Sequence, residues 1–163
     1  MYSATTGAQA VILGNLKKCG RGKKEIMDVW LMNAPVKRMS RHACLTPPLG
    51  LAYIASVLIK AGYSVSIADF NIIGFSPNLL KEILKREAPR ILGISTHTKT
   101  YLNSLKIAEI AKQVNPATTV VMGGTHPSAM YQAVAEEKNV DVVVRGEGEY
   151  TMLELANYLI SNK

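Results

Sequence analysis

The stretch RILGISTHTKTYLNSLKIAEIAKQVNPATTVVMGG, residues 90–124, decides the fold of this chain. It begins with the apolar run RILGIS and ends with a second one, TVVMGG, and each has the length and composition of a buried strand. The segment between them predicts a helix over about residues 101–114, because its apolar side chains recur at helical spacing. These side chains are Ile107, Ile110, Ala111 and Val114. The order strand, helix, strand predicts two parallel strands joined by a crossover helix.

The same alternation continues on both sides of this unit. Further strands are predicted at residues 28–34, 63–70 and 140–144, and further helices from about residue 51 to Gly62 and at 78–85, 128–138 and 149–159, with a loop at 71–77. Five strands alternating with five helices imply a parallel sheet covered on both faces, and right-handed crossovers leave few topologies. We predict a three-layer, doubly wound α/β fold of the flavodoxin-like or Rossmann-like type, with strand order 2-1-3-4-5.

Composition and charge favour one globular domain. Residues 26–163 are predicted to form it, and residues 1–25 to form a disordered leader. The net charge is +7, and part of it lies in KKCGRGKK, residues 17–24. No aromatic residues alternate with these charges, so we interpret the run as solvated and expect no nucleic-acid partner. No apolar run reaches membrane-spanning length and the secretory-signal layout is absent, so we expect no membrane association and a cytoplasmic location.

The loops that follow the strands are where a ligand is expected. In an open parallel sheet, ligands bind beyond the carboxyl ends of the strands, where the strand order reverses. Hydroxyl groups follow the third strand, on Ser95, Thr96, Thr98 and Thr100. Two glycines, Gly123 and Gly124, follow the fourth strand and allow a ligand to approach the backbone. Each loop alone is better explained by helix caps and turns. With RGEGE, residues 145–149, after the fifth strand, small or polar residues follow three successive strands at one sheet edge, and together they predict a site.

The residues at these positions exclude or disfavour several other classes of protein that have such a fold. A receiver domain needs an acidic cluster, a phosphorylatable Asp and a Lys where this chain has Asn33, Ser95 and Arg145. The loop after the first strand is basic and proline-rich, which disfavours flavin. The dinucleotide fingerprint GxGxxG is absent there, and no phosphate-binding GK[ST] occurs.

Catalysis by the chain alone finds little support. Ser95 and His126 could form a nucleophile–base pair, but no carboxylate is placed to orient the base. His97 and His126 could form a metal pair, but no third ligand is evident. We therefore assign neither a catalytic residue nor a metal ligand.

Four motifs carry a resemblance to a known family. They are PPLGLAYIASVL, LGISTHT, VVMGGTHPS and VVVRGEGEYTMLEL, and they extend over most of residues 28–159. In this order and spacing, the chain resembles the N-terminal cobalamin (vitamin B12)-binding domain of cobalamin-dependent radical SAM enzymes. The resemblance implies that the chain is a cobalamin-binding module serving a radical SAM catalytic domain, in cis or in trans, in methyl transfer or another radical reaction.

The resemblance also bears on the cobalt. The wider cobalamin-binding fold has DxHxxG, then a serine after the third strand and two glycines after the fourth. Ser95 and Gly123–Gly124 match, but the DxHxxG position reads NAPVKR, with Pro35 in place of the histidine. This departure is similar to the radical SAM branch, whose cobalamin is bound without a protein histidine and with its nucleotide tail inside the domain. His42, later in the same loop, stays open as a ligand.

The resemblance implies a cofactor site built from the loops at the strand ends. Its expected members are Pro48, Leu49, Gly50, Ser95, Thr96, His97, Gly123, Gly124, Thr125, His126, Arg145, Gly146 and Glu147. In this interpretation the prolines stiffen a wall facing the corrin, the glycines make room for the ring system or the tail, and the polar groups bond its amides or phosphate.

One large part of the family pattern is missing. The radical SAM half binds an iron–sulfur cluster through CxxxCxxC, whereas this chain has only Cys19 and Cys44. The cluster and S-adenosylmethionine are therefore expected only in a partner or missing domain. The alternative interpretation is a regulatory or protein-interaction domain that keeps the fold and has lost the ligand.

Overall fold

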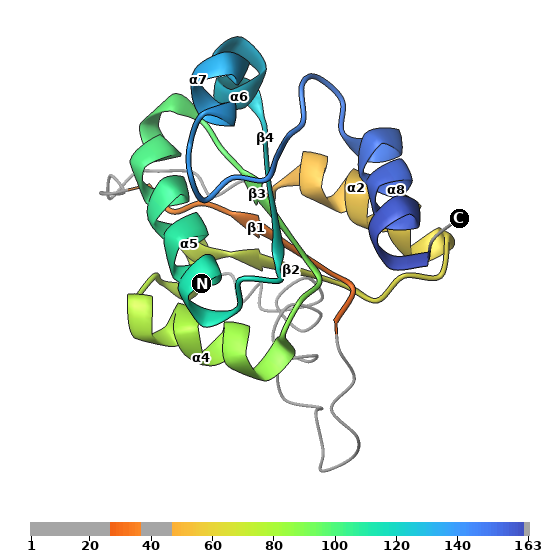
Figure 1. The fold of residues 1–163 in the computed structure, drawn as a ribbon, viewed down its shortest axis with the longest axis horizontal. Coiled ribbons are helices and arrows are strands. Elements are labelled where there is room, and N and C mark those ends of the chain that lie inside the picture. The colour runs from red at the N-terminus through yellow and green to blue at the C-terminus, as the bar shows by residue number, and fades with distance from the viewer. Residues whose placement is uncertain (1–26, 37–46, 162–163) are drawn as a thin grey trace, which may run out of the picture.

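The computed structural model describes residues 27–36 and 47–161. Figure 1 shows a central parallel sheet with helices on both faces. The strand order is β2-β1-β3-β4-β5, which confirms the predicted topology. The strands are β1 (Val29–Asn33), β2 (Val65–Asp69), β3 (Ile91–Ser95), β4 (Thr119–Gly123) and β5 (Val142–Val143). The predicted leader, residues 1–25, lies outside the described residues.

The longer helices begin and end where local signals place them. They are α2 (Leu49–Lys60), α4 (Pro77–Glu87), α5 (Tyr101–Val114) and α8 (Glu149–Ala156). At the start of α4, the Ser76 hydroxyl accepts a hydrogen bond from the Leu79 N–H at 3.1 Å, and Pro77 is the first helical residue. After α2, Gly62 has a φ of 94°, the left-handed conformation that suits glycine beyond a helix end.

Two apolar cores lie on opposite faces of the sheet. On one face, α2 and α8 pack over Val29, Leu31 and Val121, with Leu58 and Met152 as helical partners. On the other face, α4 and α5 cover a larger cluster that includes Trp30, Leu92, Ile107 and Met122. Figure 1 shows this division, with α2 and α8 together on one side and α4 and α5 on the other. Alternate strand residues therefore serve different cores.

Some elements differ from the sequence-based expectations. The segment expected to be a loop after β2 begins with a short helix, α3 (Phe70–Ile73), because the Asp69 carboxylate accepts a hydrogen bond from the Asn71 N–H at 2.9 Å. The single helix expected at 128–138 is two short ones, α6 (Thr125–Ala129) and α7 (Tyr131–Ala135), which meet at the non-helical Met130. The predicted last helix ends at Ala156 and continues as a wider turn, η2 (Asn157–Ser161).

The register of the sheet aligns the carboxyl ends of four strands. Asn33 pairs with Asp69 on one side and with Ser95 on the other, and Ser95 pairs with Gly123. Beyond this row, the Thr96 N–H donates to the Gly123 carbonyl oxygen at 2.8 Å. The loops after β3 and β4 are thus held together at the edge where the ligand site is predicted. Within the described ranges, no helix is both long and apolar enough to cross a membrane.

Candidate functional site

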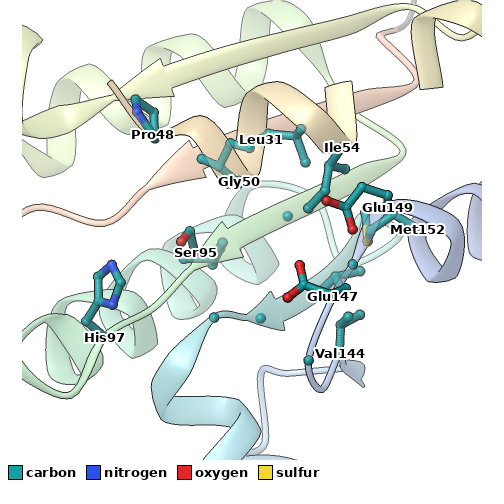
Figure 2. Close-up of a pocket in the computed structure, with 18 residues that line it drawn as sticks. Leu31, Pro48, Gly50, Ile54, Ser95, His97, Val144, Glu147, Glu149 and Met152 are labelled. Carbon is teal, nitrogen blue, oxygen red and sulfur yellow. The ribbon is translucent and has the colours of Figure 1, made fainter. Parts of the chain in front are cut away.

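A cavity of about 240 Å³ opens at this edge, on the sheet face that carries α2 and α8. Its walls come from β1, β3 and β4 and from the segments that lead into the two helices (Figure 2). The apolar lining residues are Leu31, Leu51, Ile54, Ile94, Val121, Val144 and Met152. Since Leu31 and Met152 are almost fully buried, the cavity reaches the apolar core of this face. Its position is the reversal point between β1 and β3.

Many of the residues that line the cavity are glycines, which have no side chain to fill it. Six of them line it: Gly50, Gly93, Gly123, Gly124, Gly146 and Gly148. A Cβ atom at Gly93 would lie 2.7 Å from Leu31 Cδ2, so a side chain there would displace the end of the Leu31 side chain. A Cβ at Gly50 or Gly146 would meet nothing within 4 Å, so these positions border open space. The glycines thus form a cradle that side chains would narrow.

The predicted site residues divide into two groups. Eight of them line the cavity: Pro48, Gly50, Ser95, His97, Gly123, Gly124, Gly146 and Glu147. They come from the starts of α2 and α8 and from the ends of β3 and β4, so the fold brings together segments that are far apart in the sequence. The other five do not line it: Leu49, Thr96, Thr125, His126 and Arg145.

Thr96 departs most clearly from the expectation. Its side chain is fully buried, and its hydroxyl donates to Ser104 Oγ at 2.9 Å. Its carbonyl oxygen accepts from the His126 N–H at 3.3 Å. The Thr96 hydroxyl therefore faces α5 rather than the cavity, because residues 95 and 96 point to opposite faces of the sheet.

Two histidines cross-brace the loops after β3 and β4. His97 Nδ1 lies 3.0 Å from Thr125 Oγ1, and His126 Nδ1 lies 3.2 Å from Thr98 Oγ1. Each histidine thus bonds a threonine of the other loop. His97 lines the cavity, whereas Thr125 and His126 contact the loop that carries His97 without lining the cavity themselves. In the described part of the chain, no three metal-binding side chains gather in one place.

Tyr101 extends this brace towards α7. Its ring lies 4.2 Å from the His126 ring, centroid to centroid, and its hydroxyl donates to Glu137 Oε1 at 2.9 Å. Burial raises the pKa of Tyr101 from 10.0 to about 12, and the hydrogen bond and negative charge of Glu137 act in the same direction.

We expect Tyr101 to be among the last tyrosines to ionise, at about pH 12. Between pH 10 and this value the unfolded chain loses the proton first, so Tyr101 destabilises the fold as the pH rises. Below pH 10 the phenol is neutral in both states and this contribution is constant. Ultraviolet titration of the wild type and of Tyr101→Phe measures the ionisation. If Tyr101→Phe loses a tyrosine ionisation near pH 10 and keeps the ionisation near pH 12, the raised pKa does not belong to Tyr101.

The chain between β5 and α8 is held by α6 and α7. The Gly146 N–H donates to Ser128 Oγ at 2.9 Å, and the Arg145 guanidinium lies 3.9 Å from the centre of the Tyr131 ring. Arg145 therefore stacks outside the cavity, whereas Glu147 faces it (Figure 2). These contacts fix the direction from which the loop approaches the mouth.

Sequence reasoning missed ten lining residues. Seven are the apolar side chains named above, and the others are Gly93, Gly148 and Glu149. The apolar residues follow the same hydrophobic pattern as residues of a filled core, so the sequence does not show that they line a cavity. Glu149 had a usable signal, since it belongs to the same GEGE motif as Glu147. The cavity thus combines apolar walls, glycine edges and two carboxylates.

Comparison with known proteins points to one cofactor. Residues 42–156 match the family described as the B12 binding domain. The chain is 34% identical over 138 residues to an uncharacterised methyltransferase of Pyrococcus horikoshii, a match that covers 83% of this chain and 30% of that protein. It is 36% identical over 111 residues to the anaerobic magnesium-protoporphyrin IX monomethyl ester cyclase of Rubrivivax gelatinosus, covering 67% of this chain and 20% of that protein. The chain therefore spans less than a third of the length of these two relatives.

A solved structure shares the fold. It is the radical S-adenosylmethionine methyltransferase TsrM from Kitasatospora setae, with cobalamin and a [4Fe-4S] cluster bound. The TM-score is 0.71 at 20% identity, and the match covers 85% of this chain and 27% of that one. At this identity the likeness concerns the arrangement of the strands and helices.

Proposed function

We propose that this chain, which belongs to the B12-binding domain family, binds cobalamin at the carboxyl-end edge of its sheet, with the nucleotide tail in the cavity. The observation that carries the proposal is the open, glycine-lined cavity at the reversal point of the strand order. A filled core at this edge would leave no place for a tail. The tail is the narrow end of the cofactor, and it suits a cavity between a sheet and two helices.

The residues present fit this part of the cofactor. The volume of about 240 Å³ is below the roughly 300–1,000 Å³ of pockets for drug-sized ligands, so a fragment of cobalamin enters and the corrin stays outside. Apolar walls such as Ile54 and Val121 suit a flat aromatic base. Gly50 and Gly123 border the space without side chains that would occupy it.

We further propose that the protein supplies no histidine to the cobalt. Pro35, at the position where the wider family has its histidine, has no side chain that could bind a metal. The His97 ring is tied to Thr125 and stands at the cavity mouth, where its other nitrogen can bond a polar group of the ligand. His42 lies outside the described residues. When bound, cobalamin supplies methyl-transfer chemistry, and the chain's own role is to hold and orient it.

A radical SAM catalytic domain is the proposed partner, in cis or in trans. The support is twofold: TsrM combines this fold with an iron–sulfur cluster in one protein, and the present 163 residues contain no CxxxCxxC. Large apolar side chains are also exposed near the starts of helices that begin at this edge of the sheet. They include Leu49 and Tyr53 of α2, Leu102 of α5 and Tyr150 of α8. Where exposed apolar side chains form a contiguous patch, they mark a surface that another domain or a large ligand covers.

The test of cobalamin binding is direct. The purified chain is incubated with hydroxocobalamin and desalted, and the visible absorption of the protein fraction is recorded. We expect retained corrin absorbance at a stoichiometry near one per chain. A folded protein that elutes colourless would reject the proposal and favour the ligand-free regulatory or interaction domain. Circular dichroism of the same fraction shows whether the protein is folded.

A further inference from the structure

Two carboxylates face the cavity from the segment that precedes and begins α8. Glu147 and Glu149 both line it, and in Figure 2 their carboxyl groups point into the space between α2 and the strand ends. Neither carboxylate forms a hydrogen bond or an ion pair with any described residue. No described residue therefore occupies their acceptor oxygens, and the cavity that they face has an apolar floor.

The sign of the charge in the cavity is opposite to that of the whole chain. The net charge is +7, yet among the described residues no lysine or arginine lines the cavity. Arg145, the nearest cation in sequence, is stacked on Tyr131 outside it. A phosphate group inside the cavity would meet two like charges and, from the residues that the structure describes, no counter-charge, which is strongly unfavourable at contact distances. A hydroxyl group would instead find two strong acceptors.

We propose that Glu147 and Glu149 select the uncharged end of the nucleotide tail, by accepting hydrogen bonds from its ribose hydroxyls and keeping its phosphate outside. This inference rests on the proposed function and specifies which part of the ligand the cavity recognises. The chemistry is that of acidic side chains that bind ribose hydroxyls in dinucleotide sites. The base then lies on the apolar floor, the ribose lies at the mouth, and the phosphate and corrin lie beyond it.

A second effect of these carboxylates must be separated in the test. Negative charge at a helix N-terminus stabilises the helix, and Glu149 is the first residue of α8. Removing the charge can therefore loosen the fold without any role in recognition. Cobinamide, which has the corrin but no nucleotide, distinguishes the two effects, because a general loosening weakens both ligands whereas lost ribose contacts weaken only cobalamin.

The experiment measures the affinity of the whole chain for cobalamin and for cobinamide. The variants are Glu147→Gln, Glu149→Gln and the double variant, with Glu154→Gln as the matched control, since Glu154 is exposed on α8 and does not line the cavity. Charge-assisted hydrogen bonds are about twice as strong as neutral ones, so we expect the double variant to lose roughly tenfold or more in cobalamin affinity. Cobinamide affinity stays within about twofold of the wild type, and the control is unchanged.

Competition with tail fragments gives the second measurement. The free nucleoside of the tail should displace cobalamin at a lower concentration than its monophosphate does. In the double variant the two fragments should compete at more similar concentrations. Unchanged cobalamin affinity in the double variant, an equal loss for both corrinoids, or a monophosphate that competes better than the nucleoside would each overturn the inference. A wild-type chain that binds neither corrinoid would overturn the proposed function itself, which is a different result from any of these.

Discussion

Gly124→Ala is expected to lower the free energy of unfolding by about 3 kcal/mol and to abolish cobalamin retention. Gly124 has a φ of 102° and a ψ of −169°, a region that only glycine enters readily. A Cβ there would also lie 2.7 Å from the Thr96 carbonyl oxygen and 3.0 Å from its nitrogen. Both atoms belong to the backbone and cannot move aside as a flexible side chain would. Urea denaturation followed by circular dichroism measures the loss.

The neighbouring glycine is the matched control. A Cβ at Gly123 would have its nearest contacts at 3.7 Å, with Val144, and the residue does not have a positive φ. We therefore expect Gly123→Ala to change the free energy of unfolding by less than about 1 kcal/mol. Equal destabilisation by the two substitutions would show that the close approach of Gly124 to Thr96 does not carry the effect.

Gly123→Leu is expected to lower cobalamin affinity by about 100-fold or more while the chain stays folded. Gly123 lines the cavity at the end of β4, and the space beside it accepts a Cβ, so the added side chain can enter the cavity without displacing backbone. A leucine there would compete with the nucleotide tail for the same volume. Visible absorption after desalting and a binding titration both report the loss.

The control for this substitution is Ala52→Leu. Ala52 is exposed on α2 and does not line the cavity, so the same side chain is added without blocking it. We expect its cobalamin affinity to equal that of the wild type. Undiminished binding by Gly123→Leu would place the tail elsewhere. If Gly123→Leu still binds cobinamide specifically, even if more weakly, the leucine blocks the cavity for the nucleotide tail and leaves the surface that contacts the corrin accessible.

The secondary structure and topology were predictable where local signals are strong. Helix α5 spans Tyr101–Val114, as its apolar spacing predicted, and the predicted strand order 2-1-3-4-5, one of the few that alternation and crossover handedness allow, is confirmed. Prediction failed after β4, where α6 and α7 replace one helix. Here the chain is shaped by contacts with the loop after β3, such as the bond between His126 and Thr98, which lie far apart in sequence.

The candidate site was predictable as an edge of the sheet but not as a set of side chains. Five of the thirteen expected residues do not line the cavity, because loop position does not say which way a side chain points. Thr96 and Ser95 illustrate this, since adjacent residues beyond a strand face opposite layers. The apolar walls were missed because a residue that lines a cavity and one that fills a core have the same hydrophobic pattern.

The sequence by itself determined the alternation of strands and helices, the edge at which the carboxyl ends of the strands meet and the glycines that follow them, because periodicity and turn chemistry are local properties. Only the tertiary structure decided that the space between α2, α8 and the sheet stays open, that Thr96 faces away from it and that Glu147 and Glu149 share it. These features depend on how segments distant in sequence pack against one another. Whether a small residue such as Gly93 leaves a gap depends on which side chains come to lie over it.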